Sequence, residues 1–365
     1  MTSINRRRFI GTTAALSAAA STGFHTSRAA EENKTVNFAL VGLGKLSTNQ
    51  LAPALQKTKY AKLAGIVTGT PEKEKIWANK YGIKPENIYN YDTYDKLAQN
   101  ESIDVIYIVL PNGMHKEFTV RGANAGKHIF CEKPMANSSQ ECREMIVACD
   151  NNNVKLGVAY RLQFEPHHRH CIELAQSKQF GPLKAIEAGF GFKIGDPNQW
   201  RLDADLAGGG ALMDVGIYAL NACRYLTGEE PVAISAQETK TDPKKFAEVD
   251  ETITWTMTMP SGVNCYCSTT YAFNGINHFN AYADRGWFGL DPAYGYGGIK
   301  GRSSKGVIEF DETDQFAEEM DAFAKTILDG TQTRVPGQEG LKDLLAIEAI
   351  YESIRTRKTC DVKSV

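Results

Sequence analysis

Two short stretches of the sequence hold side chains that could move a proton at a bound ligand. Glu132-Lys133-Pro134 places a lysine before a proline, and the extended backbone preferred there holds the side chain in one direction. Asp214 and Tyr218 stand four residues apart, so on a helix they share a face and can meet one ligand. A tyrosine hydroxyl can exchange a proton, and a nearby ammonium favours its charged form. The plainer alternative is a packed aromatic at Tyr218 and a structural hydrogen bond at Asp214.

A glycine-rich turn follows the apolar run 36–41. After Gly42 and Gly44, Ser47 occupies the position where a dinucleotide-binding turn has its third glycine. The first glycine permits the tight turn, the second lets the backbone approach a pyrophosphate, and the third position needs a small residue for helix packing. The turn predicts a bound dinucleotide, with contacts from Gly42, Leu43, Gly44, Lys45 and Leu46.

The end of the second apolar run indicates which dinucleotide binds. Enzymes that read unphosphorylated NAD usually have Asp or Glu at this point. This chain has Thr68-Gly69-Thr70 instead, with Lys73 three residues on. Hydroxyl donors and an ammonium suit a 2′-phosphate, so we predict NADP, bound here by Thr68, Gly69 and Lys73. The alternative is that Lys73 is a solvated helix residue.

Apolar runs alternate with helical stretches from residue 35 to residue 160. Strands are expected at 36–41, 61–67, 103–110, 128–131 and 156–160, with helices beginning near Asn49, Pro71, Lys116 and Ser138. This alternation is typical of a parallel sheet with helices on both faces. We therefore predict a dinucleotide-binding Rossmann domain over residues 35–160.

Residues 161–365 have a different pattern. Alternating strands are expected at 183–192, 232–239, 252–259, 263–271, 279–283 and 306–310, and helices at 315–329 and 338–357. The pattern predicts an α+β domain with a large, mainly antiparallel open sheet. We expect this domain to bind the substrate and to form oligomer contacts, and the C-terminal helices to pack back between the domains.

The first 29 residues predict a twin-arginine export signal. Asn5-Arg6-Arg7-Arg8-Phe9 precedes a mildly apolar stretch, and Ser27-Arg28-Ala29 offers small residues at cleavage spacing. The apolar stretch is too short to anchor the protein in a bilayer. We expect export in the folded state and a periplasmic mature protein, with a basic tail as the alternative.

Composition and spacing argue against several other classes of protein. With 41 Lys and Arg against 43 Asp and Glu, nothing favours nucleic acid or an anionic membrane as a partner. The eight cysteines form no CxxC pair, and we expect mostly buried free thiols. In His167-His168-Arg169-His170 consecutive helical positions diverge by about 100°, so we expect no metal site.

Taken together, the motifs resemble the glucose–fructose oxidoreductase/inositol dehydrogenase family, and within it the periplasmic sugar branch. The resemblance covers about residues 36–354 and depends on the glycine turn, Glu132-Lys133-Pro134, Trp200-Arg201-Leu202, Gly208-Gly209-Gly210 and Asp214-x-x-x-Tyr218. It implies three catalytic residues. Tyr218 would exchange a proton with a sugar hydroxyl or carbonyl, Asp214 would orient the sugar, and Lys133 would bridge sugar and cofactor.

Further contacts are predicted around these three residues. Those with the cofactor are expected from Leu110, Asn112, His115, Glu132, Lys133, Arg161, Trp200 and Arg201, and those with the sugar from Lys133, Tyr160, Arg161, Asp214 and Tyr218. Trp287, Tyr294 and Tyr296, among glycines, form either a carbohydrate-facing loop or packing at a strand edge.

The chain departs from the family pattern near its beginning. After cleavage only residues 30–34 would precede the first strand, whereas members of the family have a longer arm that covers the cofactor and extends the oligomer. Leu46 also stands where an aromatic residue is expected. We nevertheless expect a homo-oligomer, a dimer or larger, packed through the sheet faces.

The sequence therefore predicts an exported sugar oxidoreductase with tightly bound NADP. It would oxidise an aldose at C1 to the lactone and then reduce a second sugar, fructose or an aldose, to the alditol by ping-pong hydride transfer. A compartment without a nucleotide pool requires this regeneration in one site. The alternatives are a conventional NAD(P)-dependent sugar dehydrogenase with exchangeable cofactor and a non-catalytic exported sugar-binding protein.

Overall fold

The computed structural model describes residues 34–365. The predicted export signal, residues 1–29, and its cleavage site lie outside the described residues.

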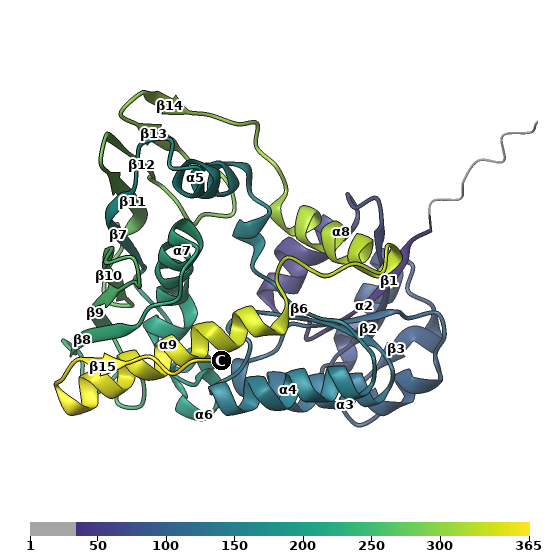
Figure 1. Ribbon diagram of the computed structural model, residues 1–365. Coiled ribbons are helices and arrows are strands. Elements are labelled where there is room, and N and C mark those ends of the chain that lie inside the picture. Colours follow the sequence, from purple (N-terminus) through teal and green to yellow (C-terminus); the bar gives the residue numbers. More distant parts are fainter. Residues whose placement is uncertain (1–33) are drawn as a thin grey trace, which may run out of the picture. The chain divides into compact units, whose positions relative to one another are not determined.

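Sheet A is a parallel, six-stranded sheet in the order β3-β2-β1-β4-β5-β6 (Figure 1). Its strands are β1 (Val36–Val41), β2 (Ala61–Val67), β3 (Ile88–Tyr89), β4 (Val105–Ile108), β5 (His128–Cys131) and β6 (Leu156–Val158). All four residues of β4 are buried, as expected for a strand covered on both faces. The sheet confirms the predicted Rossmann fold, and its strand order reverses between β1 and β4, where such sheets bind ligands.

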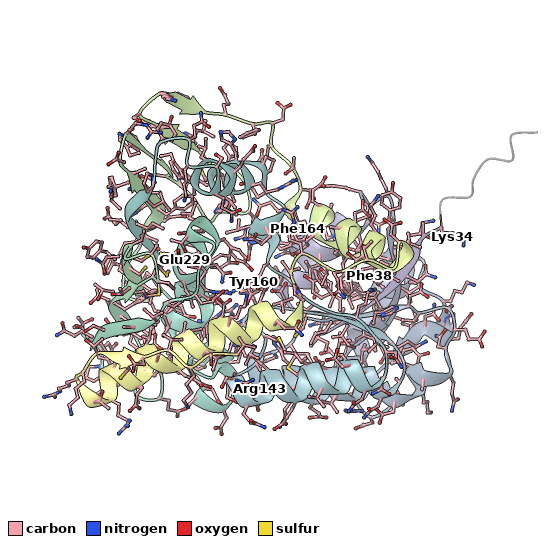
Figure 2. All side chains as sticks on the ribbon, in the orientation of Figure 1. Lys34, Phe38, Arg143, Tyr160, Phe164 and Glu229 are labelled. Carbon is pink, nitrogen blue, oxygen red and sulfur yellow. The ribbon has the colours of Figure 1, made fainter. Side chains whose placement is uncertain are left out.

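Helices connect the strands of sheet A. A π-helical turn (Ser47–Leu51) continues into α1 (Ala52–Leu55), and α2 (Pro71–Tyr81), α3 (His115–Asn124) and α4 (Ser139–Asn151) follow. Short 3₁₀ turns lie at Pro85–Asn87, Tyr94–Gln99, Asn112–Met114, Arg161–Gln163 and Trp200–Leu202. Phe38 of β1, labelled in Figure 2, is fully buried in the core beneath these helices.

Sheet B has nine strands in the order β14-β13-β12-β11-β7-β10-β9-β8-β15. They are β7 (Leu183–Gly191), β8 (Ala233–Thr239), β9 (Thr252–Thr258), β10 (Asn264–Thr270), β11 (Asn277–Ala283), β12 (Gly286–Leu290), β13 (Gly301–Ser303), β14 (Gly306–Ile308) and β15 (Cys360–Asp361). Only the pair of β7 and β10 is parallel within these strands, which confirms the mainly antiparallel sheet. In β9, buried Ile253, Trp255 and Met257 alternate with exposed threonines, so one face is covered.

Five helices complete the described part of the chain. They are α5 (Pro166–Gln176), α6 (Ala204–Ala207), α7 (Ile217–Thr227), α8 (Gln315–Leu328) and α9 (Gly337–Thr356), and a π-helical turn (Leu212–Gly216) leads into α7. Helix α7 packs on β7 and β10 of sheet B. By contrast, α8 packs on α1, β1 and β2, and α9 lies along α4 and β8 (Figure 1). The end of the chain thus returns to sheet A and brings α8 beside the predicted cofactor site.

The stretch Ala204–Thr227 is, within residues 34–365, the one helical segment long and apolar enough to span a bilayer. In its most apolar window 67% of the residues are buried inside the protein, as in the core helix of a globular domain.

Candidate active site

The glycine turn after β1 is built for close approach of a ligand to the backbone. Gly42 has φ +90°, and a Cβ there would lie 2.3 Å from the carbonyl oxygen of Val109. At Gly44 a Cβ would meet no atom within 4 Å, so this stretch of backbone faces open space. The Ser47 hydroxyl is buried and donates to the Gly42 carbonyl at 2.6 Å. The small third residue therefore closes the turn, and the geometry fits a pyrophosphate.

A lysine joins the adenosine end of the predicted cofactor site to the glycine turn. The Lys73 ammonium donates to the carbonyl oxygen of Leu43 at 2.8 Å. The Thr68 hydroxyl oxygen accepts from the backbone N–H of Thr70 at 3.2 Å, which leaves its own hydrogen for another acceptor. A cation and a hydroxyl donor in place of an acid fit the 2′-phosphate of NADP. Of the other residues in the predicted turn, Lys45 is exposed and Leu46 is partly buried.

Lys133 and Asp214 meet beyond the carboxyl end of β5. The Lys133 ammonium donates to the Asp214 carbonyl oxygen at 2.8 Å and lies 3.4 Å from its carboxylate Oδ1. Arg201 Nε donates to Asp214 Oδ2 at 2.9 Å, and the Tyr271 hydroxyl donates to the same oxygen at 2.8 Å. The carboxylate is thus fixed through Oδ2, while Oδ1 faces the lysine.

The charges in this cluster support one another. Burial would raise the pKa of Asp214, but Lys133 and Arg201 outweigh it and lower the pKa to about 2. Burial would lower the pKa of Lys133, but Tyr218 and Asp214 outweigh that effect, so this pKa is raised. At neutral pH the site therefore holds an ionised Asp214 beside a charged Lys133.

Tyr218 lies between two cations. The Lys133 ammonium is 4.9 Å from the centre of its ring, and the Arg161 guanidinium carbon is 5.1 Å away. Arg161 is itself held by the carbonyl oxygens of Tyr294 and Gly295, at 2.6 and 3.0 Å, and by Gln315. Two cations therefore lie within cation–π distance of the Tyr218 ring.

One cavity of about 400 Å³ unites these groups. Its walls are Lys133, Arg161, Phe190, Phe192, Ile194, Gly195, Gln199, Arg201, Asp214, Val215, Tyr218, Tyr294, Gly295 and Tyr296. Aromatic and apolar side chains thus surround a few convergent charged and polar groups, as is usual in small-ligand sites. The three predicted catalytic residues and Arg161 and Arg201 lie together here, and Tyr294 and Tyr296 of the glycine loop line the same space.

A buried acid supports the segment that holds Asp214. Asp250 accepts from the backbone N–H groups of Gly210 and Leu212 at 2.7 and 2.8 Å and from the Tyr351 hydroxyl at 2.6 Å. A Cβ at Gly210 would lie 1.9 Å from the Asp250 carbonyl oxygen. The last of the three predicted glycines is therefore required because the helix start packs directly on this loop.

Glu132, predicted at the cofactor, faces the protein interior. Its Oε2 accepts from the Lys133 backbone N–H at 3.2 Å, and its Oε1 accepts from the Tyr107 hydroxyl at 2.9 Å. The same hydroxyl lies 3.3 Å from Oε1 of Glu319 on α8.

Three predicted contact residues use their polar groups on the protein itself. Asn112 donates to the Ala207 carbonyl oxygen at 2.8 Å, and the ring nitrogens of His115 lie 3.0 and 2.8 Å from the carbonyl oxygens of Pro134 and Leu110. The Tyr160 hydroxyl donates to Asp343, and Tyr160 is not among the residues that line the cavity. These three residues brace the surroundings of the site, and their contact with a ligand stays a prediction.

The remaining predicted positions, Leu110 and Trp200, are not among the residues that line the cavity. The Arg201 guanidinium stacks 4.5 Å over the Trp200 ring, and Leu110 is buried beside the His115 ring.

His167 and His168 both point to the Glu165 carboxylate, with Nδ1 atoms at 2.7 and 3.0 Å from its oxygens. The histidine cluster therefore serves the start of α5.

Tyr271 and Glu319 are two polar residues near the site that sequence reasoning missed. Tyr271 follows the last residue of β10, where the predicted strand 263–271 ends. Its place at a strand end was a usable signal, because ligands gather at such ends. Glu319 gave no signal, since an acid in an amphipathic helix is usually solvated.

Two long stretches of the described chain match known protein families. Residues 36–160 match the family described as "Oxidoreductase family, NAD-binding Rossmann fold", and residues 168–289 match the "GFO/IDH/MocA C-terminal domain". Among curated proteins, a D-xylose 1-dehydrogenase [NADP(+)] of Haloarcula marismortui is 30% identical, over 89% of this chain and 92% of its own.

Two solved structures extend this comparison. The aldose-aldose oxidoreductase from Caulobacter crescentus, complexed with glycerol, has a TM-score of 0.88 and 40% identity, over 90% of this chain and all of its own. The apo scyllo-inositol dehydrogenase from Lactobacillus casei has a TM-score of 0.76 at 21% identity, over 91% and 99% of the two chains, which shows a shared fold.

Proposed function

Because the chain belongs to the Gfo/Idh/MocA oxidoreductase family and is an oxidoreductase of sugars, we propose that it oxidises an aldose at C1 to the lactone and then reduces a second sugar to the alditol. The proposed cofactor is NADP, which remains bound between the two half-reactions. The observation that carries the proposal is the single cavity of about 400 Å³ that holds Lys133, Asp214 and Tyr218, a volume suited to one monosaccharide.

Tyr218 is the proposed acid and base of the reaction. NADP, when bound, would supply the nicotinamide carbon that accepts or returns the hydride. The hydroxyl proton of the aldose passes to Tyr218 as the C1–H bond breaks, and the same proton returns to the carbonyl oxygen of the second sugar. A hydride and a proton, together two electrons and two protons, thus leave the first sugar and enter the second. Lys133 and Arg161, at 4.9 and 5.1 Å from the ring, stabilise negative charge on the reacting oxygens.

Asp214 orients the sugar through its freer oxygen. Oδ2 already accepts from Arg201 and Tyr271, at 2.9 and 2.8 Å, so Oδ1 remains to accept from a sugar hydroxyl. The pKa of about 2 keeps the group an acceptor at every working pH. Lys133, bonded to the Asp214 carbonyl at 2.8 Å, then lies where it can contact the reacting oxygen.

Export and assembly are two further parts of the proposal. We propose twin-arginine export to the periplasm, because a bound cofactor that is regenerated in place suits a compartment without a nucleotide pool. We also propose a homo-oligomer that packs through the sheet faces. The aldose-aldose oxidoreductase at 40% identity supports the choice of two sugar substrates, and the xylose dehydrogenase at 30% supports NADP.

A conventional NADP-dependent aldose dehydrogenase is the second candidate. It is favoured by the name of the 30% identical relative and by the exposure of Gly44 and Lys45 in the glycine turn, which leaves the cofactor a route to solvent.

Spectroscopy of extensively dialysed protein distinguishes the two candidates. Adding glucose or xylose alone should produce a stoichiometric reduced-nicotinamide absorbance, and a later addition of fructose or a second aldose should abolish it. Turnover only with added NADP would establish the conventional dehydrogenase. No sugar oxidation under either condition would refute both and leave a sugar-binding protein.

A further inference from the structure

Two buried carboxyl groups share one phenol at the floor of the proposed site. The Tyr107 hydroxyl on β4 lies 2.9 Å from Glu132 Oε1 and 3.3 Å from Glu319 Oε1. Glu319 is 0% exposed and Glu132 is 7% exposed. Glu132 directly precedes Lys133, so the three groups form a chain from α8 to the predicted nicotinamide end of the cavity.

The phenol has a single hydrogen, which restricts how these contacts can be made. Tyr107 can donate to one carboxylate only. The second contact is a hydrogen bond only if the other carboxyl group is protonated and donates to the phenol oxygen. Two ionised carboxylates this close in a buried site would also repel each other strongly. The geometry therefore requires one ionised and one neutral acid.

The surroundings decide which acid is neutral. Burial raises the pKa of Glu132, but the charges of Lys133 and Arg161 and the Lys133 backbone N–H, which donates to it at 3.2 Å, oppose this rise. Glu319 Oε2 has no hydrogen-bond partner in the part of the chain that the structure describes. Burial, followed by the nearby Glu132 charge, raises the pKa of Glu319 well above its ordinary value. A lone buried oxygen is tolerable on a neutral acid and very costly on a carboxylate.

We propose that Glu319 is a positioning residue that works as a neutral acid: it donates to Tyr107, Tyr107 donates to Glu132, and the ionised Glu132 is thereby fixed against the backbone of Lys133. This inference rests on the proposed function, because the residue that it positions is Lys133. Glu319 contacts neither sugar nor the reacting atoms. It acts through Tyr107 and Glu132 on the direction of the lysine side chain.

Infrared spectroscopy of the purified protein without sugar tests the protonation directly. At pH 7 the wild type minus Glu319→Gln difference should contain the carbonyl stretch of a protonated carboxyl group. The matched control is Glu318→Gln, which changes an exposed acid on the same helix and should remove only a carboxylate band. A carboxylate band alone in the Glu319→Gln difference would overturn the proposal. Because no turnover is needed, this result stands whether or not the proposed sugar reaction is confirmed.

Kinetics test the positioning role with a conservative rescue. Glutamine can still donate to Tyr107, so Glu319→Gln should keep both kcat and kcat/KM within about threefold of the wild type. Leucine cannot donate, so Glu319→Leu should lose at least about tenfold in kcat. Tyr107→Phe should match the leucine variant, since it cuts the same chain. Equal kcat values for the glutamine and leucine variants would overturn the positioning role. A circular dichroism spectrum and melting curve for each variant establish that the comparison is made between folded proteins.

Discussion

Asp214 and Glu319 are both acids beside the proposed site, yet their surroundings differ in the cations that contact them. Asp214 accepts from Arg201 at 2.9 Å and lies 3.4 Å from the Lys133 ammonium, whereas within residues 34–365 Glu319 has only the neutral Tyr107 within hydrogen-bonding distance. Burial raises the pKa of each group. For Asp214 the two cations reverse this effect and hold the pKa at about 2, while nothing of similar strength opposes it at Glu319.

The difference shows that burial alone does not decide whether an acid in this site is charged. The placement of cations decides it: Lys133 and Arg201 contact Asp214, whereas the charge of Arg161 does not offset burial at Glu319. The result is an ionised acceptor facing the sugar cavity and a neutral donor behind the strand ends. The first three of the following experiments each alter one member of this contrast.

Among the changes to charged residues, removal of Lys133 should have the largest effect. Lys133→Met deletes the cation that Asp214 and Tyr218 share, and loss of one electrostatic stabiliser at a reacting oxygen lowers kcat by about a hundred- to a thousandfold. Steady-state kinetics of aldose oxidation measure the loss. Lys75→Met, an exposed lysine on α2, is the control and should behave as the wild type. A Lys133→Met enzyme within threefold of the wild type would show that the cation has no catalytic role.

Neutralising Asp214 should cost stability in a pH-dependent way. Its pKa is about 2 when folded and 3.8 ordinarily, so the ionised form contributes about 2 kcal/mol above pH 3.8, and this is lost as pH falls through the folded value. Asp214→Asn should therefore unfold about 2 kcal/mol more easily at pH 7, with a smaller difference at pH 3. Urea unfolding at the two pH values measures this. A deficit that stays constant with pH would contradict the assigned ionisation.

Neutralising Glu319 should change the stability of the protein in the opposite direction from neutralising Asp214. Its folded pKa is raised above 4.5, so the protonated form stabilises the protein fully below pH 4.5, and this stability is lost as pH rises toward the folded value. Glu319→Gln has no carboxyl group to ionise and so does not lose this stability. The difference in unfolding free energy between Glu319→Gln and the wild type should therefore shift in favour of the variant by at most about 1.4 kcal/mol per pH unit above 4.5. Urea unfolding at pH 5 and pH 7 tests the trend, and an advantage that shrinks between them would refute it.

The smallest predicted effect concerns a cation at the other end of the cofactor. Lys73, bonded to the Leu43 carbonyl at 2.8 Å, has no acid bound to it in the described part of the chain, so its charge is available to a 2′-phosphate. Lys73→Ala should weaken NADP binding about tenfold, or about 1.4 kcal/mol, and leave NAD binding unchanged. Titration calorimetry with both dinucleotides measures the preference. An equal loss for NAD would assign the lysine to the glycine turn itself.

Features that depend on the local backbone were predictable from the sequence. Gly42 and Ser47 were recognisable because a tight turn requires small residues at fixed spacing, and the strands Val36–Val41 and Ala61–Val67 have the predicted bounds. Strand 103–110 was predicted too long, since only Val105–Ile108 pair before the chain turns at Pro111. The short strands β12 and β13 were missed, because glycines interrupt their alternation.

Side-chain partnerships across the chain were not predictable in the same way. Tyr271 reaches Asp214 from 57 residues away, and Tyr107 and Glu319 are separated by 212 residues. Nothing in local spacing marks such pairs. His115 and Asn112 were correctly placed near strand ends, but which way their polar atoms turn depends on the carbonyl groups of Pro134, Leu110 and Ala207. Long-range packing therefore decides which polar residues face a ligand.

The most direct test of the account is a single-turnover measurement on Tyr218→Phe. Phenylalanine keeps the aromatic ring between Lys133 and Arg161 and removes only the hydroxyl that is proposed to exchange the proton. Stopped-flow absorbance should show formation of the reduced nicotinamide slowed by about 10²- to 10⁴-fold, with NADP affinity and melting temperature unchanged. A rate equal to the wild type would contradict the assignment of Tyr218 as acid and base, and with it the proposed mechanism.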